Sequence, residues 1–154
     1  MQDLLTSALN PRSVAIIGAS ENIHKIGGRP IYYMQRHGFQ GAIYPVNPAR
    51  DEIQGHKSYA SMAALPEVPD LALVVVGGDK TVAAVEACAE LGVKSAVVIA
   101  SGFGETGPEG MELQRHMMAK ARAKGMRLYG PNTQGLANFG TGAIAGFSTM
   151  FIEV

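Results

Sequence analysis

Short apolar runs that end at glycine or at polar turns are the feature that most tightly constrains the fold of this chain. Residues 13–17 (SVAII) and 71–76 (LALVVV) do not alternate apolar and polar side chains, which is typical of parallel strands buried on both faces of a sheet. Further strands are predicted at residues 42–46, 95–100 and 126–129. Helices are predicted between the strands, from Gly28 to about His37, from an Asp79 cap to Gly92 and from Pro108 to Gly125. This alternation predicts an α/β fold: a Rossmann-like, doubly wound parallel sheet in three αβα layers.

The remaining segments refine this prediction of a single domain over residues 1–154. Pro45 inside the second strand favours a strand end or an irregular edge position. A short helical stretch is predicted near residues 61–65, and the glycine-rich tail from Gly135 is expected to add one or two strands. The chain stops in an apolar segment, residues 151–154, from which we expect it to be part of a longer protein.

Composition excludes several classes of function. The 154 residues are 47% hydrophobic and carry 13 Lys and Arg against 13 Asp and Glu, so the basic excess of a dedicated nucleic-acid or membrane-surface binder is missing. The single cysteine, Cys88, cannot form an intramolecular disulfide or a thiolate zinc cage, and the four histidines do not form a metal-spaced pair. The N-terminal residues do not resemble a signal peptide, and the apolar runs are too short to cross a bilayer. We therefore expect a cytoplasmic protein without a metal site.

Glycine and small polar residues follow each predicted strand. Gly18 and Ser20 follow the first strand, Asn47 follows the second and Gly77 follows the third. Ser101 and Gly102 follow the fourth strand, and Asn132 with its neighbours follows the fifth. Because ligands of open parallel sheets bind outside the carboxyl ends of the strands, the five loops together predict a binding site. Any one of these loops alone is better explained by the turns that every α/β fold needs.

The first loop has the chemistry of an anion site. A helix that starts after a glycine-rich turn favours phosphate, and His24, Lys25 and Arg29 add cationic groups there. The spacing of Gly18 and Gly27 is not the G-x-G-x-x-G of dinucleotide-binding proteins, and the second strand is followed by Arg50 rather than by a carboxylate. Arginine at this position suits a ligand with an extra phosphate near its ribose, such as NADP or coenzyme A (CoA), but it equally suits a solvated charge paired with neighbouring carboxylates. Because the G-x-S-x-G and P-loop motifs are missing, we predict no catalytic residue in this chain.

Four stretches carry a family resemblance. They are NPRSVAIIGAS at residues 10–20, YPVNP at 44–48, IASGFGE at 99–105 and GPNTQG at 130–135. In this order the chain resembles the N-terminal CoA-binding domain of NDP-forming acyl-CoA synthetases, the ADP-forming acetate–CoA ligases related to the succinyl-CoA synthetase α subunit. The resemblance covers nearly the whole chain.

The resemblance implies a domain that binds CoA within a multidomain ligase and is inactive alone. The complete enzyme would convert acyl-CoA, ADP and phosphate to free acid, CoA and ATP, through an acyl phosphate and a phosphorylated histidine. The partners implied are the phosphohistidine and ATP-grasp domains of the same enzyme, neither of which lies in this chain, and a homo-oligomer is compatible with the resemblance. The family often has cysteine after Gly-Pro-Asn, whereas Thr133 and Gln134 follow here.

The resemblance also assigns roles to residues by position. Ser20 and Lys25 would hold CoA phosphates, in the loop bounded by Gly18 and Gly27. Asn47 and Arg50 would approach the adenosine. The adenine or pantetheine would pass Val76 and Gly77, and the path toward the thiol would be lined by Ser101, Gly102, Phe103 and Asn132.

Two other classes of function remain open at this point. Related domains occur as stand-alone CoA-binding proteins and as regulatory parts fused to GNAT-type protein acetyltransferases. An NAD(P)-dependent oxidoreductase domain is the third possibility, and the missing dinucleotide motif and acidic partner disfavour it.

Overall fold

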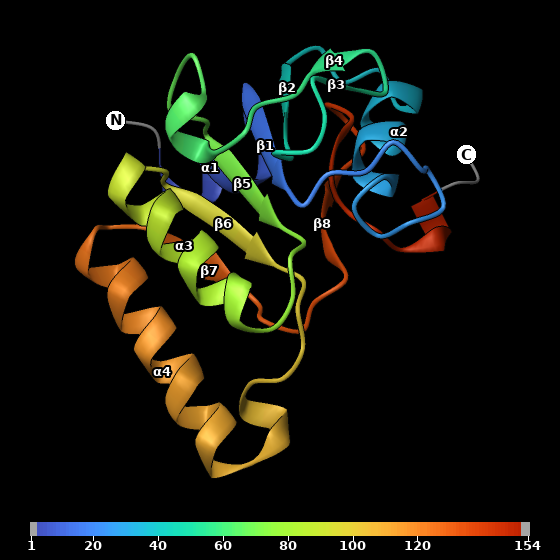
Figure 1. Cartoon of the computed structure of the whole chain (residues 1–154). Helices are drawn as coiled ribbons and strands as arrows, with labels where there is room; N and C mark the ends of the chain where they lie inside the picture. The colour runs from blue at the N-terminus through green and yellow to red at the C-terminus, as the bar shows by residue number, and fades with distance from the viewer. Residues whose placement is uncertain (1–2, 152–154) are drawn as a thin grey trace.

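A computed structural model describes residues 3–151 of the chain, built around a five-stranded parallel sheet (Figure 1). The strands are β1 (Ser13–Ile17), β2 (Ala42–Val46), β5 (Leu71–Val74), β6 (Ser95–Val98) and β7 (Arg127–Tyr129). Their order is β2-β1-β5-β6-β7, and every neighbouring pair in it is parallel. The predicted doubly wound α/β architecture is confirmed, although β5 and β6 each end two residues before the predicted ends.

Different elements cover the two faces of the sheet. On one face, α3 (Asp79–Leu91) and α4 (Pro108–Ala123) pack through Val85, Cys88 and Met117, all fully buried. The other face is covered by α1 (Leu4–Leu9), α2 (Arg29–Arg36) and an antiparallel hairpin of β8 (Gly135–Asn138) and β9 (Ala143–Gly146). The sheet is therefore buried on both sides, which explains why β1 and β5 are apolar without alternation.

Proline explains the position of β2 in the sheet. Pro45 lies opposite Ile16 of β1, and β2 is an edge strand, as its internal proline predicts. Because proline has no N–H to donate, an edge position leaves fewer ladder bonds to lose. The carbonyl of Pro45 accepts a hydrogen bond from the Tyr59 N–H at 2.9 Å.

The helix ends agree with prediction at most positions. Pro108 begins α4, and Gly92 ends α3 with a left-handed φ of 92°. The predicted capping role of Asp79 is wrong, because Gly78 occupies the cap position and Asp79 is the first helical residue. An acidic residue in the first turn still interacts favourably with the helix dipole.

Some elements escape the sequence patterns. Helix α1 was not predicted, nor was the two-residue hairpin formed by β3 (Glu52–Ile53) and β4 (His56–Lys57). A 3-10 helix, η1 (Met62–Ala64), confirms the predicted helical stretch, and two others are η2 (Gly104–Thr106) and η3 (Thr149–Phe151). The β8–β9 hairpin confirms the extra strands of the tail, while residues 152–154 of its apolar end lie outside the described residues. No helix in the described part of the chain is long and apolar enough to cross a membrane.

Candidate functional site

The loops after the five parallel strands meet along one edge of the sheet. Each is tied to its neighbour by a backbone hydrogen bond: Gly18 N–H to the Val46 carbonyl (3.1 Å), Val75 N–H to Ile17 (2.9 Å), Ile99 N–H to Val74 (3.1 Å) and Asn132 N–H to Ala100 (2.9 Å). The chain leaves β1 for β2 on one side and then crosses to β5 on the other, so the switch in strand order lies between β1 and β5. This is the place where open α/β sheets bind ligands.

Glycines allow unusually close backbone packing at this switch point. Gly18 has φ +88°, and a β-carbon there would lie 3.0 Å from Val76 Cγ1. A β-carbon on Gly27 would lie within 3.0 Å of the Gly18 carbonyl oxygen, and one on Gly28 would meet the Asn22 carbonyl in the same way. The loop of residues 18–28 therefore folds back on the end of β1, and side chains at Gly27 or Gly28 would force it open.

A hollow of about 340 Å³ lies beside this loop. It is lined by four residues that were predicted to bind a cofactor and by two that were not: Ser20, Lys25, Asn47, Arg50, Glu21 and Asn22. The two cations come from different loops, one after β1 and one after β2. Within residues 3–151, neither Lys25 nor Arg50 takes part in an ion pair. Two exposed cations and a hydroxyl around one hollow suit a phosphate group.

Asn47 has a structural task in this arrangement. Its side-chain Nδ2 donates to the Ala19 carbonyl at 3.0 Å, and its Oδ1 accepts from the Ala49 N–H at 2.9 Å. The Asn47 amide thus ties the β1 loop to the β2 loop and brings Ser20 and Arg50 to the same hollow. Sequence position indicated Asn47 as a candidate, and the structure adds this contact to that prediction.

Arg29 and the start of α2 differ from the sequence expectation. The Arg29 side chain donates through Nη1 to the Phe147 carbonyl at 3.2 Å and does not line the hollow. The Arg29 N–H donates to the Lys25 carbonyl at 3.1 Å, and Pro30 has no N–H. A carbonyl of the loop therefore accepts a hydrogen bond from a helix N–H group that we expected to face an anion. The polar groups that face the hollow are the side chains of Ser20, Lys25 and Arg50 instead.

The loop after β6 is held by a residue that the sequence analysis did not single out. The Glu105 carboxylate accepts hydrogen bonds from the N–H groups of Gly102 and Phe103. These backbone donors, Gly102 first, lower the pKa of Glu105 below its ordinary value. The sequence of this loop does not predict the contact between Glu105 and the two N–H groups, because the contact depends on the loop conformation.

The other predicted site residues lie along the same edge with different exposure. Ser101, Gly102, Gly77 and Asn132 are exposed, and Val76 is half-buried beside Gly18. Phe103 is 2% exposed and belongs to the core beneath α3 and α4, so neither its ring nor its backbone is open at the loop surface. The role of each residue toward a ligand stays a prediction.

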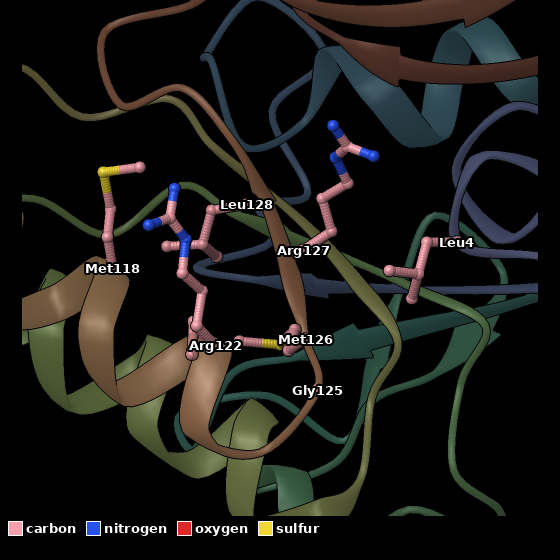
Figure 2. Close-up of a pocket in the computed structure, with 8 residues that line it drawn as sticks. Leu4, Met118, Arg122, Gly125, Met126, Arg127 and Leu128 are labelled. Carbon is pink, nitrogen blue, oxygen red and sulfur yellow. The ribbon is translucent and has the colours of Figure 1, made fainter.

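A second hollow, of about 470 Å³, lies at the other end of the sheet (Figure 2). Arg122 of α4 and Arg127 at the beginning of β7 line it together with apolar side chains that include Met118 and Leu128. Because Arg127 opens its strand, this hollow is at the amino end of β7, away from the loops at the switch point. Parallel sheets bind ligands at the carboxyl ends of their strands, where the five loops lie, and this second hollow is at the opposite end.

The described residues offer little for covalent chemistry. Burial raises the pKa of the Cys88 thiol to about 12, so this thiol is inert as a nucleophile. Within residues 3–151, groups of three or more His, Cys, Asp and Glu side chains placed to hold a metal ion are missing. The arrangement at the loop edge is suited to binding an anionic ligand.

Comparisons with known proteins agree with this geometry. The family model described as "CoA binding domain" matches residues 12–138. Acetate–CoA ligase [ADP-forming] II of Archaeoglobus fulgidus is 39% identical over 138 residues, which are 90% of this chain and 20% of that protein. The α subunit of acetate–CoA ligase [ADP-forming] II of Pyrococcus furiosus is 38% identical over 148 residues, covering 96% of this chain and 32% of the subunit.

A solved structure of an acetyl-coenzyme A synthetase also resembles this chain. The dinucleotide forming acetyl-coenzyme A synthetase 1 of Ca. Korarchaeum cryptofilum, in complex with phosphate and ADP, superposes with a TM-score of 0.88 and 37% identity. The match covers 96% of this chain and 31% of that chain. The chain thus spans between a fifth and a third of the length of these relatives.

Proposed function

Since the chain belongs to the CoA binding domain family, we propose that it is the CoA-binding domain of a longer NDP-forming acyl-CoA synthetase. The observation that carries the proposal is the hollow beside the switch point, where Ser20, Lys25 and Arg50 converge from the loops after β1 and β2. CoA carries a 3′-phosphate and a pyrophosphate, and these anions match two cations that lack an ionic partner within the described residues.

The close packing around the loop supports the same ligand. The hollow is walled by a loop whose path depends on Gly18 and Gly27, so the ligand groups would meet a fixed arrangement of side chains. Lys25 and the Ser20 hydroxyl would bind the phosphates, and Arg50 would lie toward the ribose and its phosphate. Val76 and Gly77 would border the adenine or pantetheine, and Ser101, Gly102, Phe103 and Asn132 would line the route to the thiol.

The complete enzyme would convert acyl-CoA, ADP and phosphate to the free acid, CoA and ATP. In that direction the thioester of acyl-CoA is broken and the CoA thiol is released, and the residues of this chain would bind and orient the CoA part. The phosphohistidine and ATP-grasp domains would supply the phosphoryl transfer, so this chain alone would bind CoA without turnover. The names of the relatives, which are ADP-forming acetate–CoA ligases, support this proposal.

Calorimetric titration with CoA, dephospho-CoA and NADP tests the proposed function. Saturable CoA binding that weakens when the 3′-phosphate is removed is the expected result. Tighter binding of NADP than of CoA would assign the domain to the oxidoreductase class, and the proposal would be rejected.

A further inference from the structure

The tip of the β3–β4 hairpin has an unusual backbone. Gln54 and Gly55 form the two-residue turn between β3 and β4, with φ values of +49° and +80°. Left-handed values at both positions define the turn that suits a tight hairpin, and asparagine or aspartate is the usual residue at the first one. Glutamine adopts this conformation less readily, so contacts of Gln54 with the rest of the chain must hold it there.

The side chain of Gln54 reaches the loop that walls the candidate site. Its Nε2 donates to the Ser20 carbonyl and to the Gly28 carbonyl, both at 2.9 Å. These two carbonyls mark the beginning and the end of the loop, and one amide group joins them. The Gln54 N–H also donates to the Glu21 carboxylate at 2.6 Å, which adds a third contact to the same loop.

The hairpin tip is in turn anchored to the helix that follows the loop. Gln35 of α2 donates through Nε2 to the Gln54 carbonyl at 2.8 Å, and the same nitrogen lies 3.0 Å from His56 Nε2. Gln54 therefore sits between α2 and the loop, with its backbone held by the helix and its side chain holding the loop. Gln54 is only partly exposed, so water competes less for these bonds.

The contacts of Gln54 add to hydrogen bonds that the loop makes within itself. Residues 21–26 are all exposed, and Lys25 lies among them. Within the loop, backbone hydrogen bonds run from the Ser20 N–H to the Gly27 carbonyl (3.1 Å), from the Lys25 N–H to the Asn22 carbonyl (3.0 Å) and from the Gly28 N–H to the Lys25 carbonyl (3.0 Å). With its ends joined at Ser20 and Gly28, the loop holds the backbone that carries the Ser20 hydroxyl and the Lys25 ammonium.

We propose that Gln54 is a positioning residue for CoA: it closes the loop of residues 20–28 so that Ser20 and Lys25 are arranged for phosphate before the ligand arrives. This inference rests on the proposed function of the hollow. It assigns the β3–β4 hairpin a role in ligand affinity that acts through the loop, since Gln54 does not line the hollow. Without the amide, CoA binding would have to order the loop, and the affinity would fall by that cost.

The test uses the Gln54→Met variant, which keeps the length of the side chain and removes both N–H donors. The matched control is Gln40→Met, because Gln40 is exposed and its Nε2 donates only to the nearby Gly38 carbonyl, away from the loop. Hydrogen exchange of the backbone amides of residues 20–28 is measured without ligand, and the CoA dissociation constant is measured by calorimetry at 15 °C. Lys25→Ala is titrated in parallel.

The expected result is faster exchange in residues 20–28 and about tenfold weaker CoA binding for Gln54→Met, with both quantities unchanged in Gln40→Met. Gln54→Asn, which keeps the amide and favours the left-handed turn, is expected to recover part of the affinity. Unchanged exchange in residues 20–28, or unchanged CoA affinity in Gln54→Met while Lys25→Ala binds weakly, would overturn the positioning role alone. If Lys25→Ala also binds CoA like the original chain, the proposed site itself is wrong.

Discussion

Replacing Gly27 by alanine should destabilise the domain through a steric effect that the structure locates. The new methyl group would lie within 3.0 Å of the Gly18 carbonyl oxygen, a distance that real β-carbons essentially never show. The obstacle is backbone and cannot rotate away, so the end of β1 and the loop must separate. The hydrogen bond from the Ser20 N–H to the Gly27 carbonyl, at 3.1 Å, joins the same two segments and would weaken with them.

The size of the effect follows from three contributions. Overpacking costs about 1–3 kcal/mol, and a weakened hydrogen bond adds about 0.5–1.5 kcal/mol. The lower chain entropy of unfolded alanine offsets about 0.4–1 kcal/mol. The free energy of unfolding should therefore fall by about 0.5–4 kcal/mol, which corresponds to a melting temperature lower by roughly 1–16 °C in a domain of this size.

Thermal unfolding followed by circular dichroism measures this change, and Gly77→Ala is the matched control. Gly77 lies in another loop of the same edge, has no neighbour within 4 Å of an added β-carbon and does not have a positive φ. Its substitution should change the free energy of unfolding by less than about 0.5 kcal/mol. A Gly27→Ala variant that melts at the same temperature as Gly77→Ala would refute the close approach of Gly27 to the end of β1.

Three further predictions concern charge and burial. Lys25→Ala or Arg50→Ala should weaken CoA binding by about 1–3 kcal/mol in calorimetric titrations. Lys124, at the end of α4, forms an ion pair with Glu90 of α3, and Lys124→Ala should leave binding unchanged. Because the pKa of Glu105 is lowered in the folded state, its ionised carboxylate stabilises the fold above about pH 4.5, and this stabilisation is lost as the pH falls. Denaturation curves should show that Glu105→Gln is less stable than the original chain at pH 7. The difference in stability should shrink toward pH 3. Cys88, buried and with its pKa raised to about 12, should resist maleimide labelling at pH 8 in the native state and react fully in denaturant, and rapid native labelling would contradict its burial.

The fold was predictable because its strands are buried on both faces. Apolar runs such as residues 71–76, each followed by glycine or a polar turn, carry the signal of a parallel sheet within the local sequence, and the structure has β5 there. The same logic placed the five loops at one edge, because the carboxyl ends of parallel strands share an edge. Pro45 even indicated which strand lies at the edge of the sheet.

The details of the site were not predictable in the same way. Gln54 contacts Ser20 across 34 positions, and its hairpin has strands of only two residues with Gln-Gly in the turn, so periodicity and turn patterns gave no signal. Arg29 looked like a phosphate ligand by position, yet it donates to Phe147, which is 118 residues away in the sequence. Such contacts depend on how the loops and the β8–β9 hairpin pack, and the local sequence does not specify that packing.

Mapping of CoA by amide chemical shifts tests the central claim most directly. Backbone amides of the isotopically labelled chain are followed during titration with CoA, with dephospho-CoA as the comparison ligand. We predict that the largest changes occur in residues 18–28, 47–50, 76–78 and 101–104, and that those near Lys25 or Arg50 diminish without the 3′-phosphate. Changes concentrated instead around Met118, Arg122 and residues 125–128, at the amino end of β7, would contradict the account and place the ligand in the opposite groove.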